Sequence, residues 1–247
     1  MKRYISIFEL FARNTIYKIV LVLVAMGTVQ IAMFRKVMYE WIPMDYYDLD
    51  FKTVWHYTLE YMVDRSNSVI FMGIAFVLIT VILCWNGCNI GSKSSYTTQR
   101  LQVTEKKIFI MQSIYNSLCY VLLLSAQIGV FVIQSALYVA QAGHVTNQTV
   151  FLSFYRNGFM HSVLPLDGTM RWGASALMVL GCGVSTAVFT YLQRRGKVAW
   201  SLFIVVACAL VGFVQELGSQ EAVLMTSIIW GIIVISSYTR MTQKEEE

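Results

Sequence analysis

The sequence predicts an all-α integral membrane protein with six transmembrane helices, an amphipathic N-terminal helix in the membrane interface, and both ends on the cytoplasmic side. Composition is the first observation: 57% of the 247 residues are hydrophobic and 13% are charged, roughly half the charged share of a typical soluble domain. The second is six apolar runs that meet or approach the roughly 20 residues needed to cross a bilayer. The third is the gathering of lysine and arginine at alternate edges of those runs.

The predicted spans follow directly from the apolar runs. Lipid offers the backbone no hydrogen-bond partner, so each run is expected to form a helix. The chain has two prolines and no Ser/Gly-rich linker, which favours a single transmembrane domain over residues 1–247. The expected spans are 19–34, 69–88, 108–142, 172–192, 198–214 and 222–238.

The orientation rests on the basic residues. Of the 19 lysines and arginines, 13 fall at the N-terminus, after the second span, after the fourth span or at the C-terminus, and six fall in the remaining connections. Because cytoplasmic segments carry the excess of Lys and Arg, both ends are expected inside. The net charge of +5 therefore reflects membrane topology, and no nucleic-acid partner is expected.

The N-terminal segment 4–13 has the pattern of an interfacial helix. Tyr4, Phe8 and Phe11 fall on one helical face, and Glu9 and Arg13 on the opposite one. Two basic residues precede the segment, so it is expected to lie along the inner surface of the membrane in contact with lipid.

No catalytic or metal centre is evident in the sequence. The stretch 87–94, GCNIGSKS, lacks the spacing of a phosphate-binding loop. Ser175 lies in a small-residue motif similar to that of rhomboid-like intramembrane proteases, but every histidine precedes it, so the required later base is missing. We therefore expect no enzyme and no cofactor in this chain, while a weak exterior metal or proton site at His144, His161 and Asp167 stays open.

A polar stripe interrupts the third predicted span. Its members recur every seven residues or lie one turn away, and seven residues are nearly two helical turns, so they share a face. Such a stripe is expected to face a partner helix or a water-filled pathway, and both interpretations remain open. The residues are Asn116, Tyr120, Gln127, Gln134 and Gln141.

The connection before the third span carries the most specific local pattern. The stretch 94–110 reads SSYTTQRLQVTEKKIFI. With the six-span layout, it resembles a type-2 permease subunit of an ATP-binding-cassette (ABC) transporter, where a Thr and Leu segment and a polar turn lead into a charged start of span three. The family often has Leu-Pro-Val-Ser at this turn, whereas this chain has Leu101-Gln-Val-Thr104. The matching residues are Thr97, Arg100, Leu101, Thr104 and Glu105.

The resemblance implies a function that the residues alone do not. In such permeases this segment docks on a separate ATPase subunit, which binds ATP and Mg²⁺, and a second permease copy or a related permease completes the pathway. The implied role is export of a peptide, drug or lipid-like substrate. Residues 151–166 are similar to a segment of small permeases of Gram-positive bacteria, which implies the bacterial plasma membrane. A non-transporting assembly or sensor subunit is the alternative, and a membrane-embedded enzyme the third.

The predicted topology can be tested by cysteine labelling. In a cysteine-free background, Ser94→Cys should react with a membrane-impermeant maleimide only after the cells are permeabilised, whereas Thr53→Cys should react on intact cells. Labelling of Ser94→Cys on intact cells would place the 93–107 connection outside and overturn both the orientation and the expected ATPase contact.

Overall fold

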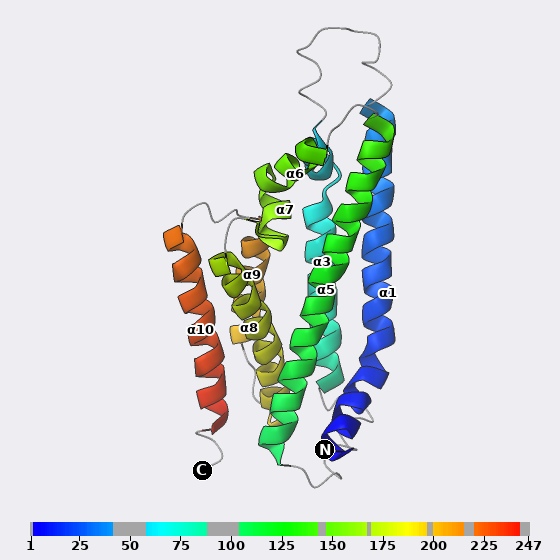
Figure 1. The fold of residues 1–247 in the computed structure, drawn as a ribbon. Helices are drawn as coiled ribbons and strands as arrows, with labels where there is room; N and C mark the ends of the chain where they lie inside the picture. The colour runs from blue at the N-terminus through cyan, green and yellow to red at the C-terminus, as the bar shows by residue number, and fades with distance from the viewer. Residues whose placement is uncertain are drawn as a thin grey trace.

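The computed structural model describes residues 2–41, 58–87, 104–142, 147–166, 169–196, 200–214 and 220–242. Within these ranges the regular secondary structure is α-helical throughout (Figure 1). The helices are α1 (Lys2–Trp41), α2 (Leu59–Arg65), α3 (Ser68–Gly87), α5 (Glu105–Ala142), α6 (Asn147–Arg156), α7 (Gly158–Val163), α8 (Thr169–Arg194), α9 (Ser201–Val214) and α10 (Gln220–Thr242).

Four of these helices are long and apolar enough to cross a membrane. The qualifying stretches are Phe8–Glu40, Ser68–Asn86, Glu105–Gln141 and Thr169–Arg194. Shorter apolar stretches occur in α9 and α10, over Ser201–Phe213 and Leu224–Ser236. The six expected spans thus fall on α1, α3, α5, α8, α9 and α10. The length and composition of α1, α3, α5 and α8 support a helical membrane protein.

Helix α5 lies at the centre of the bundle. It packs against α1, α3 and α8, while α9 contacts α8, α3 and α7, and α10 packs along α8 (Figure 1). Helix α1 begins and α10 ends at the same end of the bundle, and α6 and α7 lie at the opposite end (Figure 1). The molecule is therefore a bundle of elongated helices in which α3 contacts α1, α5, α8 and α9, with α1 and α10 at the two edges (Figure 1).

The N-terminal segment differs from the expectation of a separate interfacial helix. Helix α1 is continuous from Lys2 to Trp41, because neither glycine nor proline interrupts residues 13–19, although Figure 1 shows a bend in its first turns. Phe11 is 1% exposed, and the rings of Phe8 and Phe11 lie 5.3 and 6.2 Å from that of Tyr115 on α5. These two rings therefore pack on the bundle and not into lipid, while the side chain of Tyr4 lies outside the described part.

Two glycines allow α8 to approach its neighbours closely. A Cβ atom on Gly183 would lie 2.8 Å from the backbone nitrogen of Ser117 on α5, and one on Gly181 would overlap the Trp230 ring on α10. Small residues at such crossings are how membrane helices gain packing contacts when water provides no driving force. The backbone of Ser117 cannot move aside as a flexible side chain can, so Gly183 fixes the distance between α5 and α8.

Replacing Gly183 should therefore destabilise the bundle. Gly183→Ala is expected to lower the free energy of unfolding by roughly 1–3 kcal/mol, the usual cost of overpacking, as measured by SDS titration in mixed micelles. Gly129→Ala on α5 is the matched control, because its added methyl group has no neighbour within 4 Å. Equal stability of the two variants would show that α5 and α8 do not approach each other at this point.

Candidate functional site

Helix α5 carries a row of buried polar side chains, here called the polar ladder. Gln112, Asn116, Tyr120, Gln127 and Gln134 are all no more than 4% exposed, although they lie on a helix long enough to cross a membrane. Four of them belong to the stripe expected from the sequence, and Gln112 extends it by one turn. The fifth expected member, Gln141, is exposed.

One half of the ladder bonds to α8 and α3. The amide of Gln112 donates to the Thr190 hydroxyl, and that of Asn116 donates to the Thr186 hydroxyl, both at 2.9 Å. Each threonine donates in turn to a carbonyl of its own helix. One turn further, the Tyr120 hydroxyl lies 2.9 Å from that of Thr80 on α3.

The other half of the ladder joins α5 to α1 and to the start of α3. Gln127 and Gln30 exchange two amide hydrogen bonds of 3.0 Å, and both side chains are 0% exposed. Gln30 also donates to the Ser68 carbonyl at 3.2 Å. Gln134 donates to the Ser68 hydroxyl at 3.4 Å, and that hydroxyl lies 2.8 Å from the hydroxyl of Ser66.

The chemistry of the ladder is that of neutral donors and acceptors. Its amides and hydroxyls bond to neighbouring helices, and a void of only about 10 Å³ lies beside Tyr120. Among the described residues, no group of three or more His, Cys, Asp or Glu side chains could hold a metal ion. Among the described residues the ladder thus connects four helices, and the space beside Tyr120 is about the size of a single methyl group or less.

The segment expected to dock on an ATPase is only partly described. Thr97, Arg100 and Leu101 lie outside the described residues, Thr104 precedes α5, and Glu105 is its first residue. The Glu105 carboxylate lies 2.6 Å from the Arg195 guanidinium, just beyond α8, and that guanidinium lies 4.6 Å from the centre of the Tyr191 ring. The start of α5 is therefore attached to the end of α8 within the chain itself.

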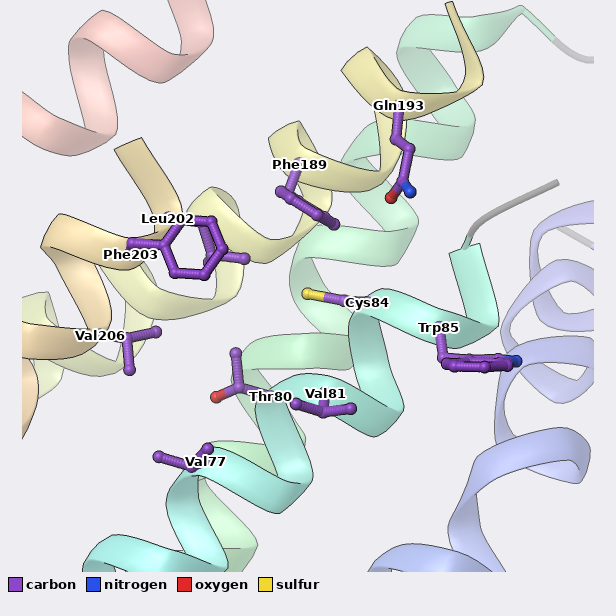
Figure 2. A pocket seen from close by; sticks show the side chains of 10 residues that line it. All are labelled: Val77, Thr80, Val81, Cys84, Trp85, Phe189, Gln193, Leu202, Phe203 and Val206. Carbon is purple, nitrogen blue, oxygen red and sulfur yellow. The ribbon is translucent and has the colours of Figure 1, made fainter. Parts of the chain in front are cut away.

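An apolar pocket of about 360 Å³ lies between α3, α8 and α9. Figure 2 shows the Cys84 thiol from α3 pointing into this space, with Val206 on the facing α9. Thr80, which bonds to Tyr120 of the ladder, forms part of its wall. The lining residues are Val77, Thr80, Val81, Cys84, Trp85, Phe189, Gln193, Leu202, Phe203 and Val206.

The suggested exterior cluster is represented by one of its three residues. His161 on α7 is 2% exposed, and its ring lies 5.3 Å from that of Tyr155. His144 and Asp167 lie outside the described residues. Next to His161, Asn157 caps α7 by accepting from the Met160 amide at 3.0 Å.

Several residues that contact the ladder were not predicted from the sequence. Gln30 is the one amide side chain in the first apolar run, 19–34, and such a side chain among apolar residues could have indicated a partner. Thr186 and Thr190 are four residues apart on α8, and Gln112 and Asn116 are four residues apart on α5. The equal spacing of the two pairs could have indicated that they face each other. The pocket had no such signal, because its lining is mostly ordinary apolar side chains.

Comparison with known proteins does not assign the chain to a family. No protein-family model matches the chain, and neither the curated proteins nor the solved structures contain a match. The function must therefore be inferred from the residues of the chain itself.

The Gln30–Gln127 pair should be energetically coupled. Gln127→Leu is expected to lower the free energy of unfolding by roughly 1–3 kcal/mol, because the buried Gln30 amide loses both of its hydrogen bonds to Gln127. The double variant Gln30→Leu/Gln127→Leu should cost less than the sum of the two single changes, by roughly 0.5–2 kcal/mol. SDS titration of the four proteins measures this cycle. Gln141→Leu, at an exposed position of the same helix, should have little effect, and strictly additive costs would contradict the pairing.

Proposed function

We propose that the chain is the membrane-spanning permease subunit of an ABC transporter, with six spans and both ends in the cytoplasm. It exports a peptide, drug or lipid-like molecule using ATP and Mg²⁺ bound by a separate ATPase subunit. The basis is the resemblance of residues 94–110 and of the overall layout to type-2 permeases. A single chain of this kind is a half-transporter, so a second copy or a related permease completes the pathway.

The lengths of the last two helices are compatible with six spans. Helix α10 has 23 residues, about 34 Å at 1.5 Å per residue, and its apolar stretch Leu224–Ser236 lies within the run 222–238 that is expected to span. Helix α9 has 14 residues, or about 21 Å, and is short by itself. Helix α7 packs against it, and the Ser162 hydroxyl of α7 donates to the Phe213 carbonyl near its end at 3.2 Å, so α7 and α9 together can fill the membrane thickness.

The observation that carries the proposal is the continuity of α5. It starts at Glu105, at the end of the proposed docking segment, and runs without a break for 38 residues. Through the polar ladder it is bonded to α1, α3 and α8. A displacement of its first turn by an ATPase would therefore be transmitted to three helices at once, as rigid-body coupling requires.

The ion pair between Glu105 and Arg195 refines this proposal. Glu105 already has a partner inside the chain, so it can act by holding α8 as well as by contacting an ATPase. Both charged groups are solvent-accessible, and such pairs contribute only about 0–1 kcal/mol to stability. Breaking the pair should consequently leave the fold intact and allow the two roles to be separated.

Charge reversal at the docking segment should uncouple the ATPase. Wild-type chain purified in mild detergent from its own host is expected to carry a P-loop ATPase. Arg100→Glu and Glu105→Arg should each weaken that association by about tenfold or more, because like charges in an interface cost several kcal/mol. Co-purification and ATP hydrolysis provide the measurement.

Two controls separate docking from internal attachment. Arg195→Glu breaks the ion pair but leaves Glu105 in place, and should keep the ATPase bound. The exchange Glu105→Arg/Arg195→Glu restores a pair of reversed polarity and should remain defective. Full rescue by the exchange would show that Glu105 acts only within the chain, and absence of any ATPase from the wild-type preparation would count against the permease role itself.

A non-transporting assembly or sensor subunit is the second candidate function. It is favoured by the bonding of the ladder side chains to other helices and by the small void, about 10 Å³, beside Tyr120. Reconstitution with the co-purified ATPase distinguishes the two functions. ATP hydrolysis accompanied by movement of substrate supports the permease, whereas hydrolysis without movement supports the sensor.

A further inference from the structure

The apolar pocket between α3, α8 and α9 opens to the side of the bundle. Trp85 and Phe203 on its rim are 65% and 60% exposed, whereas Thr80 and Cys84 deeper in the pocket are 5% and 8% exposed. In a membrane protein, the space outside this rim is filled by lipid. The pocket is therefore a lateral recess that hydrocarbon can enter without crossing water.

The recess occupies the depth of one leaflet. Its wall on α3 extends from Val77 to Trp85, about 12 Å along the helix axis, which is under half of the roughly 30 Å hydrocarbon core. Trp85 lies two residues before the end of α3, and tryptophan is enriched where the membrane meets water. The Val77 end of the recess thus lies toward the middle of the membrane, and the Trp85 end lies close to the lipid headgroups.

Positive charge lies at the headgroup end. Gln193 lines the recess there, and Arg194 and Arg195 follow it directly in the chain. Lys106 and Lys107 lie in the first turn of α5, whose first residue bonds to Arg195. The described residues of these two helix ends therefore include four basic side chains and one acidic side chain, that of Glu105.

We propose that this recess binds one acyl chain of an anionic phospholipid, with the phosphate at the Gln193 end. Hydrocarbon fits because Thr80 already bonds to Tyr120, so a peptide backbone would find few partners there and would remain unsatisfied. A helix from a second copy, about 10 Å wide, does not fit a space of about 360 Å³. The proposal depends on insertion of the chain in a membrane and not on the permease role.

The recess also contacts the inner polar network. Thr80 forms part of its wall and bonds to the Tyr120 hydroxyl of α5 at 2.9 Å, and the Tyr120 ring lies 5.3 Å from that of Phe76 on α3. A bound acyl chain would therefore lie against the Thr80 side chain, whose hydrogen bond joins α3 to the central helix.

The test fills the recess from each of its two walls. Val77→Phe on α3 and Val206→Phe on α9 place a ring inside it. Ile74→Phe and Ile204→Phe are the matched controls on the same helices, because these side chains are 52% and 65% exposed and do not line the recess. The full-length chain in mild detergent is titrated with phosphatidylglycerol or phosphatidylcholine, and bound lipid is counted by native mass spectrometry.

The expected result is one tightly bound phosphatidylglycerol per wild-type chain, bound better than phosphatidylcholine, with a preference that falls as salt is added. Each filling variant should bind it roughly tenfold more weakly, the effect of displacing about two methylene groups, while both controls bind as wild type does. Equal binding by filling variants and controls overturns the site. Equal binding of the two lipids overturns the role of the basic end.

Discussion

Polar groups inside a membrane must find their partners within the protein, and most of the polar ladder of α5 meets that requirement, although the Gln134 Oε1 atom has no hydrogen-bond partner among the described residues. Each buried amide or hydroxyl left without a partner would cost several kcal/mol in lipid. Gln112 and Asn116 use hydroxyls of α8, Tyr120 uses one of α3, and Gln127 uses the amide of Gln30 on α1. Because each pair requires a particular neighbour at a particular height, the ladder sets both the order and the register of the central helices.

The other contacts of the bundle depend on that register. Gly183 can lie against the backbone of Ser117 only if α5 and α8 are aligned as the Asn116–Thr186 bond requires, and the Glu105–Arg195 pair closes the same two helices at their ends. Helix α10 is attached differently, since it packs along α8 through the Gly181–Trp230 contact. The fold thus has a tightly registered centre and an edge helix, α10, that packs against a glycine of α8.

The sequence predicted the helices and the stripe, but not the partners. Asn116, Tyr120, Gln127 and Gln134 were recognisable because a period of seven residues within an apolar run is a local signal. That Gln127 pairs with Gln30, 97 residues away, depends on which helices become neighbours, and one sequence does not encode this visibly. The contacts of the N-terminal segment were not predictable for a similar reason: the amphipathic face of Phe8 and Phe11 packs against Tyr115 of the bundle, and periodicity cannot distinguish that partner from lipid.

The composition of the ladder determines which stimuli can act on it. Amides, hydroxyls and a phenol carry no charge between about pH 5 and 8, so protonation in that range does not alter its bonds. A membrane potential of 100 mV does about 2.3 kcal/mol of work on each elementary charge that crosses it, yet the ladder offers none. The ladder that joins α1, α3, α5 and α8 therefore responds directly neither to pH in this range nor to the membrane potential, and a stimulus that rearranges it must do so by displacing the helices it joins.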